Sequence, residues 1–133
     1  MSQENAEIVL EGLRLYEAND MSAAAEVYSE DAWISGPEGW PEQGPFRGRK
    51  AVFDQFERLK AGWDEHRFVD VGTVAARGDW VVIRYTWEAR GATSGIETAF
   101  DLCAAYRVID GLITEAHFRW DEADALEAAG LRE

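Results

Sequence analysis

The stretch EAHFRWDEADAL near the C-terminus places His117 four residues before Asp121. On a helix this spacing would bring an imidazole and a carboxylate onto one face, where they could work as an acid–base pair. On a strand the same four residues span about 13 Å, too far for the two side chains to meet. Apolar residues alternate up to Trp120, which indicates a strand. We therefore expect His117 to point away from the core and Asp121 to cap the helix that follows.

The chain has one other histidine, His66, and one cysteine, Cys103. The pattern does not fix the direction of His66, which at the rim of a pocket would be the histidine able to act as a base. Cys103 lies in an apolar, strand-like run, and this favours a small buried residue over a nucleophile. Two histidines far apart in the sequence and a single thiol lack the spacing of metal ligands. No metal and no cofactor is expected.

Composition and charge narrow the range of functions. The chain has 133 residues, 47% of them apolar, which suffices for one domain with its own core. Its formal charge of −13 repels phosphate groups, so neither nucleic acid nor an anionic membrane is an expected partner. No apolar run reaches the roughly 20 residues that span a bilayer, and the N-terminus has no cationic signal-peptide head. We expect a cytoplasmic protein with a single domain over residues 1–133.

The spacing of apolar residues differs between the two halves of the chain. The first half has helical spacing and predicts three helices, over 2–19, 21–30 and 49–63. Residues 32–48 hold all three prolines; they can begin as a strand and must then become a loop. From His66 onward the period is two, and turn residues separate four predicted strands. These strands cover residues 68–76, 80–89, 96–109 and 112–120.

Three helices followed by a hairpin sheet make an α+β domain. The pair Asp110-Gly111 between two apolar runs is a strong hairpin signal, so the strands are expected to form an antiparallel meander. Long strands twist and curl, and helices must cover the concave face that results. The predicted architecture is a cone-shaped curved antiparallel sheet, with three N-terminal helices on its concave face and a short C-terminal helix.

Four segments resemble the SnoaL-like members of the nuclear transport factor 2-like superfamily: PFRGRKAV, WDEHRF, GDWVVIRYTWEARGATSGIE and YRVIDGLITEAHFRWDEADALEAAGL. The resemblance runs from about Glu7 to Leu131, over nearly the whole chain. It implies a pocket between the curved sheet and the helices. The superfamily includes isomerases, polyketide cyclases, epoxide hydrolases, dehydratases and non-catalytic binding domains, so the resemblance implies a fold and does not select a function.

The resemblance also allows the catalytic residues of related enzymes to be sought in this chain. The two acids of the ketosteroid isomerases fall at Gly36 and Ala104, and Tyr16 lies one turn beyond the position of their tyrosine. Steroid isomerase chemistry is therefore not expected. The pocket acid of the polyketide cyclases would correspond to Asp101 or Glu97 only if a bulge reversed the face of that strand.

Strand alternation predicts which side chains face the pocket. Ala104 and Ala116 are small residues among large ones, which indicates either a cavity beside them or a gap plugged by Tyr16 or Trp63. Trp40, on the loop, could act as a lid. An aromatic wall of this kind suits a small apolar or aromatic molecule. The predicted ligand-binding residues are Tyr16, Trp40, Trp63, Tyr85, Trp87, Leu102, Ala104, Tyr106, Ala116, Phe118 and Trp120.

Two functions remain open at this point. The first is a binding domain that holds a small apolar or aromatic molecule without chemistry. The second is a small isomerase, cyclase or hydratase that acts on an apolar carbonyl-type substrate, with Tyr16 or Tyr106 as the donor and His66 or a water as the base. The lack of an evident inward-facing carboxylate favours the first, and the many enzymes of the superfamily favour the second.

The residues expected on the outer face of the sheet predict a homodimer. Ala99, Cys103 and Ala105 are small and apolar on that face, beside the pairable charges of Asp101 and Arg107. The resemblance implies association through the same face. We expect an interface in the range of specific contacts, about 1,200–2,000 Å².

Overall fold

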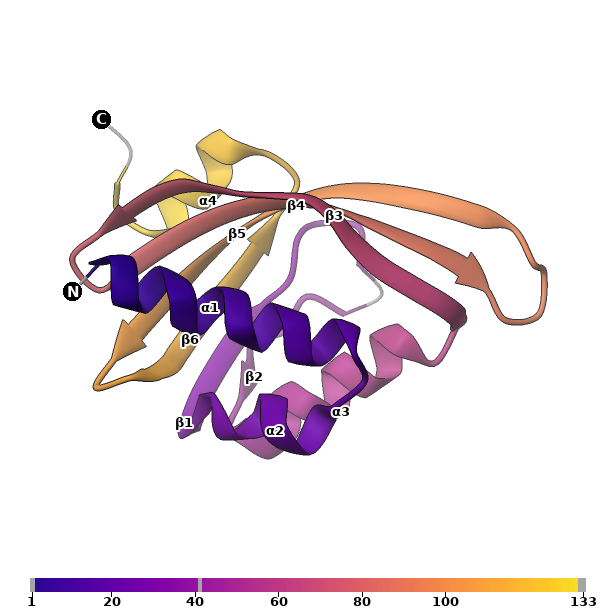
Figure 1. The fold of residues 1–133 in the computed structure, drawn as a ribbon, viewed down its shortest axis with the longest axis horizontal. Helices are drawn as coiled ribbons and strands as arrows, with labels where there is room; N and C mark the ends of the chain where they lie inside the picture. The colour runs from indigo at the N-terminus through magenta and orange to yellow at the C-terminus, as the bar shows by residue number, and fades with distance from the viewer. Residues whose placement is uncertain (1, 41, 132–133) are drawn as a thin grey trace.

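The computed structural model describes residues 2–40 and 42–131, in which four helices pack on a six-stranded sheet (Figure 1). The helices are α1 (Ser2–Glu17), α2 (Met21–Glu26), α3 (Arg49–Lys60) and α4 (Glu122–Ala128). The strands are β1 (Tyr28–Ser35), β2 (Phe46–Arg47), β3 (Trp63–Arg77), β4 (Trp80–Gly91), β5 (Glu97–Ile109) and β6 (Leu112–Arg119). The predicted α+β class is confirmed. No helix in the described part of the chain is long and apolar enough to cross a membrane.

The strands are arranged in the order β2-β1-β6-β5-β4-β3. Strands β3 to β6 form the predicted antiparallel meander, in which each strand pairs with the next one along the chain. The sheet as a whole is mixed and not wholly antiparallel, because β1 runs parallel to β6 and places Ser35 opposite His117. These two residues are 82 positions apart, and alternation within one strand says nothing about such a distant neighbour.

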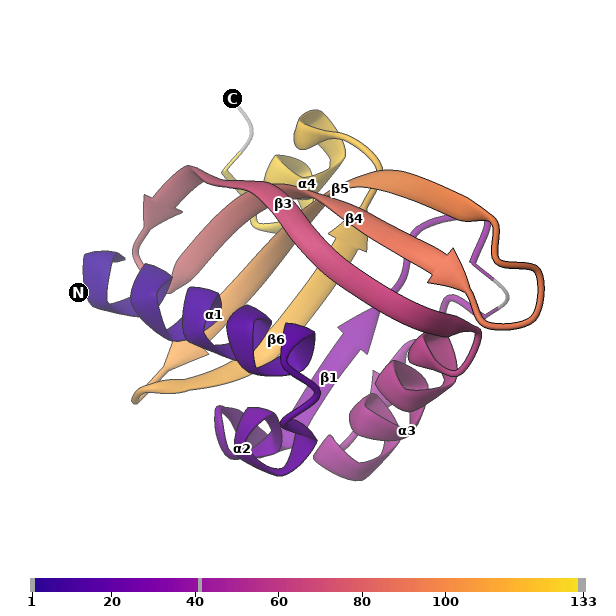
Figure 2. The same ribbon diagram turned by 45° about the vertical axis from the view of Figure 1, so that its right-hand side comes forward.

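Helices lie over both faces of the sheet (Figure 1 and Figure 2). Apolar residues are buried on each face. Helices α1, α2 and α3 lie over the concave face, as predicted, and there Val9 and Val52 share one buried cluster with Ile83. Helix α4 lies over the convex face, where its apolar side packs against Cys103 and Ala105. Because α4 covers these two small residues, they cannot contribute to a subunit interface as the sequence analysis expected.

The second predicted helix is shorter than expected. Helix α2 ends at Glu26, and β1 begins at Tyr28, which was predicted to lie on the helix. The Tyr28 ring packs into the core between Phe53 and Phe56, with ring centres 5.2 and 5.9 Å away. The backbone N–H of Ile113 on β6 donates to the carbonyl of residue 27 at 2.9 Å. Tertiary contacts therefore outweigh the local helical spacing at this point.

The third predicted helix also ends early. Helix α3 stops at Lys60, and Trp63 is the first residue of β3, not part of the helix. One apolar residue at helical spacing fits a helix end and a strand start equally well, and Gly62 favours a break between them. The pairing of β3 with β4 shifts register around Asp70, whose φ is +55°. Irregularities of this kind bend a strand and add to the curvature of the sheet.

Helix α4 begins and ends as the sequence indicated. The Asp121 side chain accepts a hydrogen bond from the backbone N–H of Asp124 at 2.9 Å, which is an N-cap. At the other end Gly130 has a φ of +71°. Its N–H and that of Leu131 donate back to carbonyls of the last turn, over 3.0 and 2.9 Å. This arrangement is a Schellman motif.

Candidate functional site

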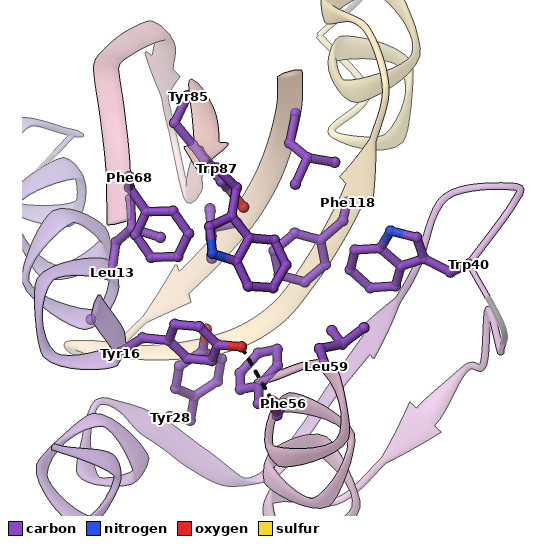
Figure 3. Close-up of a pocket in the computed structure, with 13 residues that line it drawn as sticks. Leu13, Tyr16, Tyr28, Trp40, Phe56, Leu59, Phe68, Tyr85, Trp87 and Phe118 are labelled. Carbon is purple, nitrogen blue, oxygen red and sulfur yellow. Dashed lines mark hydrogen bonds between the residues drawn. The ribbon is translucent and has the colours of Figure 1, made fainter. Parts of the chain in front are cut away.

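A cavity lies between the concave face of the sheet and helices α1 and α3 (Figure 3). Its volume is about 40 Å³. Strands of the meander supply one wall, the two helices supply the other, and Trp40 enters from the loop between β1 and β2. The lining residues are Gly12, Leu13, Tyr16, Tyr28, Trp40, Phe56, Leu59, Phe68, Tyr85, Trp87, Leu102, Tyr106 and Phe118.

Most of the predicted ligand-binding residues lie in this wall. Strand alternation correctly turned the aromatic side chains of β4 and β5 inward, and Trp40 lies against Phe118, with ring centres 5.6 Å apart and planes 28° from parallel. The predicted residues that line the cavity are Tyr16, Trp40, Tyr85, Trp87, Leu102, Tyr106 and Phe118.

Ala104 and Ala116 face the core but do not line the cavity. The pairing of β5 with β6 places Ala104 opposite Phe118 and Ala116 opposite Tyr106. The two aromatic rings have centres 6.0 Å apart. Each alanine thus lies across from a large ring, and both alanines are fully buried. These rings take up the space that was predicted beside the two alanines.

Trp63 and Trp120 were also predicted to face the pocket, and neither does. The Trp63 ring packs on Trp87 and Phe100, with ring centres 6.1 Å away in both cases, and does not line the cavity. Trp120 is 42% exposed, and its indole N–H donates to the carbonyl of Glu38 at 2.6 Å. Strand β6 ends one residue before Trp120, so the alternation that predicted an inward side chain no longer applies there.

The remaining lining residues were not predicted as site residues. On α1, Leu13 lies three residues before Tyr16, which was predicted. On α3, Phe56 lies three residues before Leu59. This spacing puts each pair on one helix face and was the signal that could have identified them. The full set that was missed is Gly12, Leu13, Tyr28, Phe56, Leu59 and Phe68.

Tyrosine hydroxyls are the main polar groups of the cavity wall. The hydroxyl of Tyr16 donates to the backbone carbonyl of Phe56 at 3.2 Å (Figure 3). Burial raises the pKa of Tyr16, and it raises the pKa of Tyr28, Tyr85 and Tyr106 as well. The interaction with Tyr85 raises the pKa of Tyr106 further. All four hydroxyls are therefore neutral at physiological pH and can donate hydrogen bonds, but they cannot act as bases.

His66 lies beside Trp87 and does not line the cavity. Its Nδ1 accepts a hydrogen bond from the indole N–H of Trp87 at 2.9 Å, so the neutral ring carries its proton on Nε2. Burial lowers the pKa of His66, and the nearby Lys60 ammonium lowers it further. The Nε2 atom is buried without a hydrogen-bond partner in the described residues. As placed, the ring has no free lone pair with which to act as a base.

Lys60 is a cation near Tyr16 that was not among the predicted site residues. Its Nζ lies 5.3 Å from the centre of the Tyr16 ring and 3.7 Å from a carboxylate oxygen of Glu57. The side chain is only 14% exposed. Its aliphatic stem therefore packs against the protein while its charge rests on the face of an aromatic ring.

His117 points to the convex face of the sheet, as predicted, and makes no contact with Asp121. Its Nε2 lies 3.0 Å from a carboxylate oxygen of Glu115, and its Nδ1 lies 2.7 Å from the hydroxyl of Ser35. A carboxylate can only accept, so Nε2 carries the proton and Ser35 donates to Nδ1. The guanidinium of Arg119 donates to the same hydroxyl at 3.1 Å.

The partners of His117 give it a structural role. Its hydrogen-bonding capacity is used in full, and the contacts join β1 to β6 on the side of the sheet away from the cavity. The imidazole is 6% exposed and packs on Trp33, with ring centres 4.8 Å apart. Burial lowers the pKa of His117, although the Glu115 carboxylate acts in the opposite direction. The ring is therefore neutral at physiological pH.

Other reactive groups are distant from the cavity. In the part of the chain that the structure describes, no carboxylate or histidine lines it, and no group of three His, Cys, Asp or Glu side chains could hold a metal ion. Cys103 lies under α4 on the convex face. Burial raises the pKa of its thiol to about 11, so the thiol is protonated.

Comparison with solved structures supports the fold. A "putative polyketide cyclase" from Xanthomonas campestris pv. campestris is 19% identical, with a TM-score of 0.78 over 90% of this chain and 92% of that one. Bal32a, from a soil-derived mobile gene cassette, is 21% identical, with a TM-score of 0.76 over 96% of each chain. TerC, co-crystallised with polyporic acid, is 18% identical, with a TM-score of 0.76 over 96% of this chain and 98% of TerC.

At these identities the similarity establishes the fold alone. The search of curated protein sequences found no match. The family model for the SnoaL-like domain, however, matches residues 9–116, from the middle of α1 into β6. This match spans most of the chain and agrees with the resemblance seen in its segments. The chain therefore belongs to the SnoaL-like family.

Proposed function

We propose that the cavity binds a small, flat, apolar molecule with a hydrogen-bond acceptor, such as a carbonyl oxygen, at one end. The observation that carries the proposal is the polarity of the wall, in which neutral tyrosine hydroxyls are set among aromatic and aliphatic side chains. A protonated hydroxyl donates to a carbonyl without burying a charge. TerC has the same fold and was co-crystallised with a small molecule, which supports the proposal.

The same wall favours binding over turnover. Isomerisation, cyclisation or hydration of a carbonyl compound requires a base within hydrogen-bond reach of the substrate. Burial keeps the tyrosines protonated, and the Nδ1 of His66 is already bonded to Trp87. The described residues of the wall include no carboxylate.

A small isomerase, cyclase or hydratase is the second candidate. Tyr106, or Tyr16 after losing its bond to the Phe56 carbonyl, would polarise the carbonyl of an apolar substrate. A water, or His66 after losing its bond to Trp87, would take the proton. The name of the Xanthomonas protein favours this candidate. Polarisation by a neutral tyrosine is chemically sound, so the two candidates differ only in whether a base reaches the bound molecule.

One probe distinguishes the two candidates. Prodan is a flat naphthalene with a propionyl ketone, and its emission moves to shorter wavelength in apolar surroundings. We expect saturable, blue-shifted binding to the wild-type protein. In D₂O the protons next to the ketone of bound prodan exchange faster than in buffer only if a base acts on them. The binding proposal predicts that the exchange rate, measured by proton NMR, is the same with and without the protein. An exchange rate that rises with protein concentration and then saturates would establish the second candidate.

A conservative variant tests the tyrosine contribution. Tyr106→Phe removes one hydroxyl and keeps the ring, and the lost hydrogen bond of about 1 kcal/mol should weaken prodan binding about five-fold. Trp33→Phe, on the convex face, is the matched control and should leave the affinity unchanged. Equal affinity in Tyr106→Phe and wild type would contradict the assigned role of that hydroxyl.

We also propose that the chain forms a homodimer through the outer face of the sheet. Because α4 covers Cys103 and Ala105, the interface would use the part of that face that α4 leaves open, which includes the exposed Ala99 and Asp101. Light scattering at micromolar concentration should give twice the mass of the chain, and a monomer would refute the proposal. The cytoplasmic location stays a prediction from the sequence.

A further inference from the structure

The cavity is too small for the molecule that it is proposed to bind. Its volume is about 40 Å³, close to the roughly 30 Å³ that one water molecule takes up in the liquid. Pockets that hold drug-sized ligands measure about 300–1,000 Å³. A flat aromatic molecule can therefore enter only if part of the wall gives way.

Trp40 is the part of the wall that no helix or strand holds in place. Every other lining residue belongs to a helix or a strand, whereas Trp40 comes from the loop after β1. Its side chain is half-buried, while Phe118 beneath it is 6% exposed. Figure 3 shows the indole at the outer side of the cavity, beside Phe118 and Leu59. The indole stacks on the Phe118 ring.

Gly36 leaves the space in which the indole of Trp40 lies. A β-carbon at this position would lie 2.4 Å from Cε3 and 3.0 Å from Cζ3 of Trp40. Any side chain there would push the ring away from Phe118. The backbone of Gly36 lies outside the left-handed region, so alanine is compatible with its conformation. The glycine is thus required by the close approach of the indole and not by a turn.

We propose that the Trp40 indole occupies the place of the ligand's ring system. This inference rests on the proposed function and adds the class of ligand. The ligand has a flat, fused bicyclic ring that stacks on Phe118 in place of the indole, and its acceptor points inward to Tyr85 and Tyr106. In the unliganded protein the indole fills this subsite and holds the cavity at its small volume.

The consequence for affinity follows from competition. The measured dissociation constant equals the intrinsic one divided by the fraction of molecules in which the indole is out of the subsite. Trp40→Ala removes the competitor, and Gly36→Ala displaces it without deleting the ring. Both changes should therefore tighten binding, which is the reverse of what the loss of a wall residue normally does.

The test measures prodan affinity by fluorescence in both variants and in matched controls. Trp33→Ala removes a tryptophan from the convex face, and Gly62→Ala adds a β-carbon where nothing lies within 4 Å. We expect at least ten-fold tighter binding in Trp40→Ala and Gly36→Ala, and no change in the controls. Thermal melts of each variant confirm that it is folded.

A second measurement uses the unaltered sequence. Protein that carries 5-fluorotryptophan gives one fluorine resonance for each tryptophan, and Trp40→Phe identifies that of residue 40. Saturation with prodan should move the Trp40 resonance toward the position of an exposed indole and leave that of Trp33 in place. A Trp40 resonance that stays in place during saturation would overturn the inference.

The outcomes separate the inference from the proposed function. If prodan binds wild type and Trp40→Ala binds it equally or more weakly, Trp40 is part of the ligand's wall and the inference is overturned while the binding function stands. If neither wild type nor Trp40→Ala nor Gly36→Ala binds prodan, the binding function itself fails. Tighter binding in both variants, with unchanged controls, supports both.

Discussion

Replacing Ala104 with leucine tests whether the space between β5 and β6 is filled. Ala104 is fully buried and pairs with Ile83 on β4 and Phe118 on β6. The cavity does not reach it, so the three added carbons have no empty volume to enter. Overpacking of a close-packed core costs about 1–3 kcal/mol. We expect the free energy of unfolding to fall by this amount.

Urea denaturation followed by circular dichroism measures the effect. For a domain of this size the same loss should lower the melting temperature by about 3–12 °C. Ala92→Leu, in the exposed turn between β4 and β5, is the matched control and should change stability by no more than about 0.5 kcal/mol. If Ala104→Leu were as stable as this control, a void would lie beside Ala104 and the reasoning about the paired rings would be refuted.

Two further predictions concern the stretch that first suggested an acid–base pair. Asp121→Ala should lower the free energy of unfolding by about 1 kcal/mol through the lost N-cap. In urea titrations of the double variant, this loss should add to the loss caused by His117→Ala. A non-additive result would instead indicate a coupled pair. Burial lowers the folded-state pKa of His117 below 6.5, so the unfolded chain binds more protons in the interval between the two pKa values. The free energy of unfolding should therefore fall as the pH drops below about 6.5. The urea midpoints at pH 7 and pH 5.5 should differ less in His117→Gln than in the wild-type protein. An equal difference in both proteins would contradict the buried, neutral ring.

Alternation along single strands predicted much of the site. Tyr85 and Trp87 on β4, and Leu102 and Tyr106 on β5, face the cavity because a regular strand turns every second side chain to the same side. The prediction failed for Trp120, since β6 had already ended. Alternation holds only as far as the strand extends, and strand ends are set by contacts with other elements.

The exact register between paired strands could not be predicted from the sequence. The expected gap at Ala104 is closed by Phe118, and only the register of β5 against β6 brings these two residues together. The bond between Ser35 and His117 likewise depends on the parallel pairing of β1 with β6. The position of His66 depends on its hydrogen bond to Trp87 on β4. The first and third contacts join consecutive strands of the predicted meander, where irregularities shift the register. The second joins strands that are far apart in the sequence.

The most direct test of the central claim is a crystal structure of the protein grown with prodan. Electron density for the flat ring system should lie between the sheet and helices α1 and α3, stacked on Phe118. The ketone oxygen should lie within hydrogen-bond distance of the hydroxyl of Tyr85 or Tyr106. Two results would contradict the claim that this cavity is the binding site. One is an empty cavity in crystals grown at a prodan concentration that saturates the protein in solution. The other is prodan bound only on the convex face beside α4.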